Sequence, residues 1–437
     1  MIQLYDHFHQ SSQDLYHSLK EAGFNGPAVV INDDGFLPEG VTSAYSYFCQ
    51  METGNGRPLY FNQIAVPEFW EITASNADGE VWDYSYRRAK IFYAEPKHLR
   101  LVKNVDWFDK QEKVRFTDHY NQYGWLYART YFTADQKGAT RTYFNQAKQE
   151  VLVENFMTGD IILNWQGKTH FFDSRVELFL YYFEEMGWDS SQIWYNSLST
   201  PFFLSYGMNQ PGKDILFWQE NIGDEIPGNM RALLNNPHAR TQRIIVQNYD
   251  VYIKMMDLVD ETHKSKLTYL GYIYPNIRNN QNRKDILIVT NSDQVEQLEY
   301  LVDQLTDFEF HIAALTEMSQ RLQVFDKKDN VNLYPNASAS NLDKLFKDCD
   351  IYFDINHGGQ VLSAVRRAFE NNMLIYGFQQ TAHEPKLVLK DHLYSTAEAN
   401  LLVQSLISLN GQFESTVQKQ RLGTSHESIQ RYQGILS

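Results

Sequence analysis

The chain has 437 residues, of which 43% are hydrophobic, and it carries a formal net charge of −15 at pH 7. This length is typical of two or three folded domains, and the composition excludes long disordered stretches. The acidic balance argues against nucleic acid as a main partner, because binding to a phosphate backbone requires a basic surface.

Targeting signals and cysteine usage indicate the compartment in which the protein works. Residues 1–6 contain no basic segment followed by an apolar one, so we expect no secretory signal. No apolar run is long enough to predict a transmembrane helix. The two distant cysteines, Cys49 and Cys349, form neither a metal motif nor a disulfide framework, which fits a reducing compartment. We therefore predict a cytoplasmic protein whose membrane contact, if any, is peripheral.

Residues 1–56 begin an α/β domain. Ala28–Ile31 is a continuous apolar run, which favours a strand buried on both faces. A loop with two glycines, residues 32–40, follows this strand and leads into a predicted helix. The order of strand, loop and helix is one unit of a parallel sheet.

Residues 57–172 predict many short strands, the first over Arg57–Ile64. Turn signals such as Asp135–Gly138 separate them, and their close spacing favours an antiparallel meander. Phe, Trp and Tyr are denser here than in the rest of the chain. Two interpretations remain open: these aromatic side chains form a partner-binding surface, or they reflect the high β propensity of aromatic residues.

The α/β pattern resumes over residues 173–265. We predict a helix from Asp173 to Met186 and strands at Gln192–Tyr195, Asp214–Trp218 and Arg243–Val246. Since α/β segments lie on both sides of the meander, residues 1–56 and 173–265 together predict one Rossmann-like domain, with residues 57–172 inserted into it.

Residues 266–412 predict a second Rossmann-like domain, and residues 413–437 predict a C-terminal helix. Asp285–Thr290 is the strongest buried strand, and Gln294–Leu305 is the expected helix after it. Further strands are expected at Phe308–Ala314, Val331–Tyr334 and Ile351–Ile355. This alternation indicates a doubly wound parallel sheet.

A glycine loop follows the strand Ile351–Ile355. Ligands bind beyond the carboxyl ends of the strands in such sheets, so His357, Gly358 and Gly359 are candidate ligand-binding residues. Backbone N–H groups left free at a helix start can hold an anion or a sugar hydroxyl. The alternative is a tight turn that merely needs glycine. No motif predicts a metal site or a cofactor, since His7 and His9 lack a third ligand.

These features resemble a retaining GT-B glycosyltransferase. More closely, the chain resembles the GtfB-type family, the non-catalytic partners in the O-GlcNAc transferases that modify serine-rich-repeat adhesins of the accessory Sec system. The resemblance covers most of the chain and includes the inserted meander. It implies a GT-B-like fold, a homologous catalytic subunit as partner, and an unfolded Ser/Thr-rich adhesin polypeptide as the bound substrate.

The chain departs from the active relatives on the segment Gly358–Arg367. Active members carry two spaced glutamates there, of which the second grips the donor ribose. The matching pair in this chain is either Gly359 and Arg367 or Gly358 and Arg366. A guanidinium only donates hydrogen bonds, so it cannot replace a carboxylate that accepts them from ribose hydroxyls. Arg366 and Arg367 are therefore candidate ligand-binding or acceptor-binding residues of another kind, and no catalytic residue is predicted.

The resemblance also requires cations for a diphosphate leaving group. The candidates are Arg278, Arg283 and Lys284, which precede the strand Asp285–Thr290. We interpret Arg283 and Lys284 as solvated loop charges. After that strand the chain offers Asn291, Ser292 and Asp293, and an aspartate there would repel a phosphate.

Together these observations predict a degenerate glycosyltransferase that stabilises a catalytic subunit and binds its polypeptide acceptor. One alternative is an active UDP-GlcNAc-dependent retaining glycosyltransferase with an unusual donor site. Another is a sugar-binding or peptide-binding module without a transferase partner.

Overall fold

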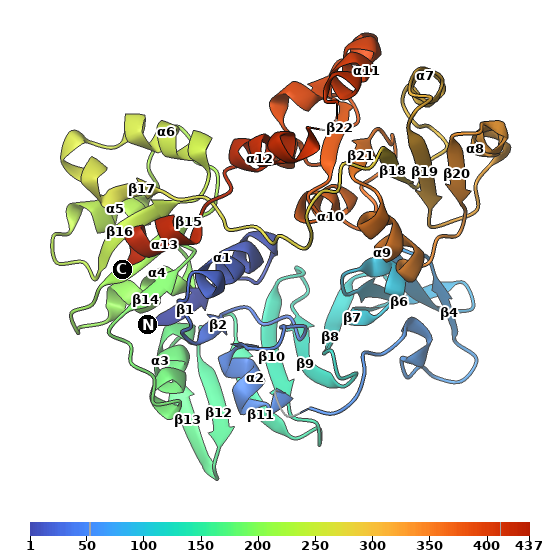
Figure 1. The fold of residues 1–437 in the computed structure, drawn as a ribbon. Coiled ribbons are helices and arrows are strands. Elements are labelled where there is room, and N and C mark those ends of the chain that lie inside the picture. Colours follow the sequence, from blue (N-terminus) through green and yellow to red (C-terminus); the bar gives the residue numbers. More distant parts are fainter. Residues whose placement is uncertain (52–53, 411) are drawn as a thin grey trace. The chain divides into compact units, whose positions relative to one another are not determined.

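The computed structural model describes residues 1–51, 54–410 and 412–437. The chain divides into two compact units, Met1–Leu270 and Gly271–Ser437, and each is considered by itself. Among the described residues, the strands form a seven-stranded sheet, a ten-stranded sheet and a six-stranded sheet. Two of these are parallel and the ten-stranded one is antiparallel, as predicted (Figure 1).

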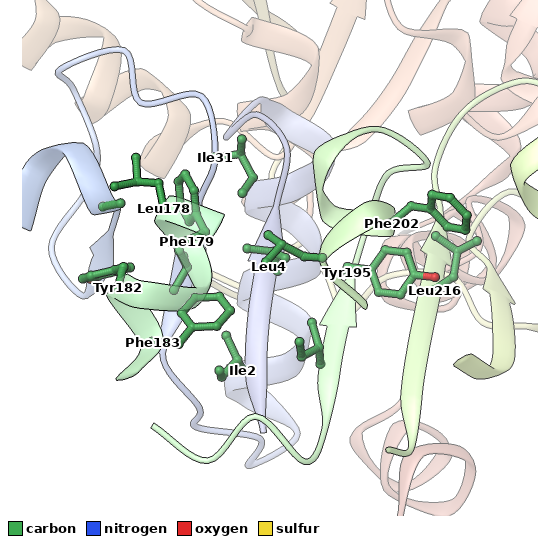
Figure 2. Close-up of a cluster of buried hydrophobic side chains, with 14 of the residues drawn as sticks. Ile2, Leu4, Ile31, Leu178, Phe179, Tyr182, Phe183, Tyr195, Phe202 and Leu216 are labelled. Carbon is green, nitrogen blue, oxygen red and sulfur yellow. The ribbon is translucent and has the colours of Figure 1, made fainter. Parts of the chain in front are cut away.

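The parallel sheet of the first unit has the order β17-β16-β15-β14-β1-β2-β3. Apolar runs form its strands, because both faces of the sheet are covered. Figure 2 shows Phe179 and Phe183 of helix α3 (Arg175–Glu185) close to Ile2 and Leu4 in the buried cluster on one face. The strands are β1 (Ile2–Tyr5), β2 (Ala28–Val30), β3 (Val41–Thr42), β14 (Ile193–Tyr195), β15 (Asp214–Trp218), β16 (Thr241–Val246) and β17 (Leu267–Tyr269).

The ten-stranded sheet is a meander, because its strands pair in sequence order. One face of its later strands packs on the first unit's core, where Tyr143 stacks on Tyr45 of helix α2 (Ala44–Phe48) with 4.5 Å between ring centroids. The strands are β4 (Glu71–Ala74), β5 (Asp78–Asp83), β6 (Tyr86–Tyr93), β7 (Val102–Phe108), β8 (Val114–Tyr120), β9 (Leu126–Phe132), β10 (Gly138–Phe144), β11 (Glu150–Asn155), β12 (Ile161–Trp165) and β13 (Lys168–Phe172).

The strand predicted at Arg57–Ile64 is wrong. Phe61–Gln63 forms a 3-10 turn, which the Gln63 side chain stabilises by accepting a hydrogen bond from the Tyr60 N–H at 2.8 Å. The segment instead covers the early meander strands, since Leu59 and Phe61 pack against a cluster of their buried side chains. An apolar covering loop and an edge strand have the same local pattern.

The second unit contains the six-stranded parallel sheet, in the order β20-β19-β18-β21-β22-β23. Its strands are β18 (Asp285–Thr290), β19 (Glu309–Ala314), β20 (Val331–Tyr334), β21 (Ile351–Asp354), β22 (Leu374–Phe378) and β23 (Leu393–Tyr394). Its helices include α7 (Leu298–Gln304), α9 (Ala339–Asp348), α10 (Ala364–Glu370) and α11 (Ala399–Ser408).

Two of the predicted helices of this unit differ from the observed ones. The helix expected from Gln294 begins only at Leu298, because Gln297 adopts a left-handed conformation with φ of 54°. Residues 413–437, expected as one helix, form α12 (Phe413–Gly423) and α13 (Ile429–Leu436). Ser425, with φ of 63°, lies between them and cannot belong to a continuous helix.

Candidate functional site

The glycine loop joins β21 to α10 at the carboxyl edge of the second unit's sheet. It is longer than the sequence predicts, because α10 begins at Ala364. Leu362 and Ser363 just before it have φ values of 47° and 51°, a left-handed conformation that non-glycine residues rarely adopt. The candidate residues His357, Gly358 and Gly359 therefore lie in the loop and not at the start of the helix.

Two of the loop amides are already used within the protein. The His357 N–H donates to the Gln294 carbonyl at 3.0 Å, and the Gly358 N–H donates to Asn356 Oδ1 at 3.0 Å. The prediction that these N–H groups are free for an anion is therefore wrong for His357 and Gly358.

The two glycines have different surroundings. A Cβ at Gly358 would lie 1.9 Å from Asn291 Oδ1, whereas a Cβ at Gly359 would meet nothing within 4 Å. Glycine at 358 thus permits close packing of the loop on the residue after β18. Glycine at 359 has no such steric requirement.

Asn356 is the centre of an uncharged hydrogen-bond network. Its Oδ1 accepts from the Thr290 hydroxyl at 2.7 Å, and its Nδ2 donates to Asn291 Oδ1 at 3.1 Å and to the Gly359 carbonyl at 3.3 Å. Thr290 and Asn356 are both buried. The network joins the ends of β18 and β21, and none of its members is charged.

A histidine from the segment after β22 completes the loop's contacts. His383 Nδ1 lies 2.6 Å from Asp354 Oδ1, and the His383 N–H donates to Asp354 Oδ2 at 2.7 Å. Its Nε2 lies 2.8 Å from the Gly358 carbonyl oxygen. The hydrogen bond to Asp354 raises the pKa of His383, and the bond to Gly358 adds to this effect. Sequence reasoning missed His383, because only the folded sheet brings it beside the loop.

Both arginines of α10 are held in ion pairs. Arg366 donates to Glu370 at 2.6 Å, and Arg367 donates to Asp343 of α9 at 2.7 Å. Arg366 is buried and lies over the Tyr274 ring, while Arg367 lies over the Phe346 ring. Glu370 is the only carboxylate on α10, and it is the partner of Arg366.

The cations before β18 lie at the opposite, amino edge of the sheet. Arg278 and Arg283 both donate to the carboxylate of Asp350, which is 0% exposed, at 2.6 Å and 3.1 Å. Burial raises the pKa of Asp350, but the hydrogen bonds from Arg283 and Arg278 outweigh this effect and lower it. The interpretation of Arg283 as a solvated charge is wrong. For Lys284, more than half of whose side chain is exposed, it is confirmed.

A hollow of about 970 Å³ lies beside the loop, and His357 is part of its wall. His357 Nε2 is 2.6 Å from Glu296, which also lines the hollow. Acidic side chains outnumber basic ones on this wall, which includes Asp293, Glu296, Glu299, Asp303, Arg321 and Lys328. Such a wall disfavours a diphosphate.

A row of polar side chains crosses the carboxyl edge of the first unit's sheet. Asn32 Nδ2 donates to Asp6 Oδ1 at 2.9 Å, and the Asp6 N–H donates to Asn196 Oδ1 at 3.0 Å. Asn196 Nδ2 donates to Gln219 Oε1 at 2.9 Å, and Gln219 Nε2 donates to Gln247 Oε1 at 2.7 Å. The five residues follow β2, β1, β14, β15 and β16, which are neighbours in this sheet. We call them the amide row.

An aromatic cluster lies next to the end of the amide row. Tyr249 of helix α6 (Tyr249–Leu258) is 51% exposed, and its ring contacts that of Tyr269 with 5.2 Å between centroids. Tyr252 lies 6.0 Å from the same Tyr269 ring. Gln247 Nε2 is buried and has no hydrogen-bond partner among the described residues.

Each residue of the amide row follows a strand of the first unit's sheet. That position is the only signal in the sequence that could have identified the row.

The face of the meander opposite α2 carries a row of aromatic side chains. Trp107 pairs with Phe116 across β7 and β8, and Phe116 pairs with Tyr131 across β8 and β9. Tyr131 is 44% exposed, and the Arg129 guanidinium lies 4.5 Å from the Phe116 ring centroid. We call Trp107, Phe116 and Tyr131 the meander aromatic row.

Among residues 1–51, 54–410 and 412–437, no group of three His, Cys, Asp or Glu side chains is placed to hold a metal ion. In the same part of the chain, no helix combines the length and apolar character needed to cross a bilayer.

Family models match four successive parts of the chain. These are the GtfB N-terminal domain over residues 2–48, the GtfB middle domain over 70–173, the GtfB third domain over 175–258 and the GftB/GlyA-F C-terminal domain over 286–421. A UDP-N-acetylglucosamine–peptide N-acetylglucosaminyltransferase stabilizing protein GtfB from Streptococcus agalactiae is 54% identical over 436 residues, 100% of this chain and 99% of that protein. The chain belongs to the GtfB family.

Another relative and a solved structure of high similarity support membership of the GtfB family. The stabilizing protein GtfB from Streptococcus parasanguinis is 48% identical over 94% of this chain and 93% of that protein. A chain from a crystal structure of a GtfA/B complex bound to UDP and GlcNAc matches with a TM-score of 0.95 and 43% identity, covering 100% of this chain and 99% of that one. The pneumococcal O-GlcNAc transferase GtfA shares the fold, with a TM-score of 0.51, 12% identity and coverage of 100% and 98%. The predicted GT-B-like fold is confirmed.

Proposed function

We propose that this chain is the non-catalytic, stabilising subunit of a peptide N-acetylglucosaminyltransferase. It binds a homologous catalytic subunit and holds the Ser/Thr-rich polypeptide that this subunit modifies. Its substrates are serine-rich-repeat adhesins of the accessory Sec system, and it works in the cytoplasm, where any membrane contact is peripheral. The names of the full-length GtfB relatives support the stabilising role.

The proposal that the chain is a degenerate enzyme rests on the side chains of helix α10. A ribose-binding carboxylate accepts hydrogen bonds from the ribose hydroxyls. Glu370, the only carboxylate on this helix, lies outside both matching frames and is ion-paired with Arg366 at 2.6 Å. Arg366 and Arg367, one of which takes the place of the second glutamate in either matching frame, can only donate, and Arg367 is paired with Asp343.

The charge distribution around the loop supports the same proposal. A diphosphate leaving group requires nearby cations. Arg278 and Arg283 are bound to Asp350 at the other edge of the sheet, and the hollow beside His357 is mainly acidic. The uncharged network around Asn356 offers no charge for a nucleotide sugar.

Calorimetric titration of the purified chain with UDP and UDP-GlcNAc tests the proposal. We expect no heat of binding at ligand concentrations up to the millimolar range. Micromolar binding of UDP-GlcNAc would favour an active glycosyltransferase with an unusual donor site. The catalytic subunit, titrated in the same way, is the positive control.

The amide row suits the proposed polypeptide ligand. An extended Ser/Thr-rich chain presents neutral amides and hydroxyls, which can hydrogen-bond to the four amide side chains of the row and to the carboxylate of Asp6. Tyr249, beside the row, offers a flat exposed ring on which a peptide or sugar group can stack. We expect Tyr249→Ala to weaken acceptor binding by about 1 kcal/mol, roughly fivefold in Kd.

Binding of a fluorescent Ser/Thr-rich peptide to the complex measures this loss. Tyr206→Ala is the matched control, because Tyr206 is 44% exposed and lies near the end of helix α4 (Thr200–Gly207). Equal losses in the two variants would refute the role of Tyr249. Failure of the unchanged complex to bind the peptide would refute the acceptor-binding part of the proposed function.

A further inference from the structure

The glycine loop has a strained backbone, and contacts with other segments of the second unit hold it in place. Leu362 and Ser363 adopt consecutive left-handed conformations, which are unfavourable for residues with a Cβ. Such a conformation persists only where surrounding contacts impose it. The contacts that hold residues 356–363 therefore decide whether the loop keeps this shape.

Two of these contacts come from one segment, residues 379–387. His383 bonds to the Gly358 carbonyl, and Gln360 Nε2 donates to Glu384 Oε1 at 2.6 Å. His383 is itself anchored to Asp354 at the end of β21 through both its ring and its backbone N–H. The loop and the segment are thus clipped together at two points.

The ring geometry of His383 requires a particular proton count. Nδ1 faces a carboxylate oxygen and Nε2 faces a carbonyl oxygen, and both of these atoms can only accept. A neutral imidazole has one N–H, so it satisfies only one of the two contacts. Both hydrogen bonds form together only when the ring is an imidazolium.

The charged groups around His383 favour this ion. Asp354 is buried at 2.6 Å from the ring, and Glu384 of its own segment acts in the same direction. On the loop side, His357 is paired with Glu296 and lies on the wall of the hollow. Consistent with this setting, the pKa of His383 is raised above its usual value.

We propose that His383 is a proton-operated clasp that holds the glycine loop against residues 379–387. Loss of the ring proton leaves Nε2 as an acceptor facing the Gly358 carbonyl, because the stronger bond to Asp354 keeps the remaining N–H on Nδ1. Two acceptors then face each other, and the strained loop is released. Release frees the Gly358 carbonyl and relaxes the position of Asn356.

Hydrogen exchange of the full-length chain tests the clasp. Exchange of residues 356–363 is measured by mass spectrometry between about pH 6 and about pH 8.5, after correction for the intrinsic effect of pH. We expect protection of this segment to fall several-fold over that range, while protection of β18 stays constant. Unchanged protection of the loop over the range would overturn the proposal.

Two variants provide matched controls. His383→Leu should expose the loop at every pH and abolish the pH response, since leucine has neither a donor for the Gly358 carbonyl nor a titrating proton. His357→Gln, which alters the neighbouring pair with Glu296, should keep the response of the unchanged chain. NMR titration of the ring of His383 in the unchanged chain gives an independent readout. A pKa at or below the usual value of about 6.5 would overturn the proposal even if a variant fails to fold.

Discussion

Replacement of Asp350 by asparagine should destabilise the second unit strongly. Oδ1 of Asp350 accepts from Arg278 at 2.6 Å and from Arg283 Nη2 at 3.1 Å. Oδ2 accepts from the backbone N–H groups of Gln281 and Arg283 and from Arg283 Nε, at 2.8–3.1 Å. The asparagine NH2 group must replace one of these oxygens, so at least two donors lose their acceptor and two guanidinium groups lose their counter-charge.

Removal of one partner from a buried ion pair costs about 3–5 kcal/mol. With a urea dependence of about 2 kcal/mol per molar, a loss of about 4 kcal/mol lowers the unfolding midpoint by about 2 M. Because the chain has two units, the assay is hydrogen exchange of β21 at each urea concentration. Arg367→Met is the control: its pair with Asp343 is partly exposed, and its loss costs less than about 1 kcal/mol.

A loss for Asp350→Asn no larger than the control's would refute the assignment of Arg278 and Arg283 as structural cations. Acid provides a second check. Because the pKa of Asp350 is lowered in the folded chain, its contribution is complete above the unfolded carboxyl pKa of about 3.9 and disappears as the pH falls through the folded value. In the variant, this part of the acid response should be absent.

Three further predictions concern the loop, α10 and the meander. Gly358→Ala should lower the free energy of unfolding by about 1–3 kcal/mol, because its Cβ would lie 1.9 Å from Asn291 Oδ1, whereas Gly359→Ala should change it by less than about 1 kcal/mol; equal effects in urea unfolding would contradict the packing argument. Arg367→Glu should not create turnover of UDP-GlcNAc, because the phosphate-binding cations remain absent, and release of UDP by this variant would contradict that reasoning. Tyr131→Lys should reduce co-elution with the catalytic subunit if the meander aromatic row is the contact surface, and an unchanged elution profile would favour the β-propensity interpretation.

The local sequence was sufficient for most strands of the parallel sheets, but β1, β3, β17 and β23 were not predicted. Asp285–Thr290 is observed with the predicted bounds, because an apolar run of this length between polar loops has few other structures. The predicted starts of α7 and α10 lie too early in the chain, since left-handed residues such as Gln297 and Ser363 have no local signature in the sequence. Helix propensity does not report a backbone conformation that distant contacts impose.

The partners of the candidate residues could not be read from the sequence. Arg283 lies 67 positions from Asp350, and the choice between solvent and a buried carboxylate is made by sheet topology. His383 reaches Asp354 only after β21 and β22 have paired. The amide row joins residues that follow five different strands, so in the sequence each member looks like an ordinary loop residue. By contrast, the absence of glutamate at positions 366 and 367 can be read directly from the sequence, because it depends on residue type alone.

The most direct test of the account is a transferase assay with UDP-GlcNAc and a Ser/Thr-rich polypeptide. The chain alone, the catalytic subunit alone and the two together are compared at equal concentrations. We predict no sugar transfer by the chain alone, and more transfer by the pair than by the catalytic subunit alone. Transfer by the purified chain without its partner would contradict the account.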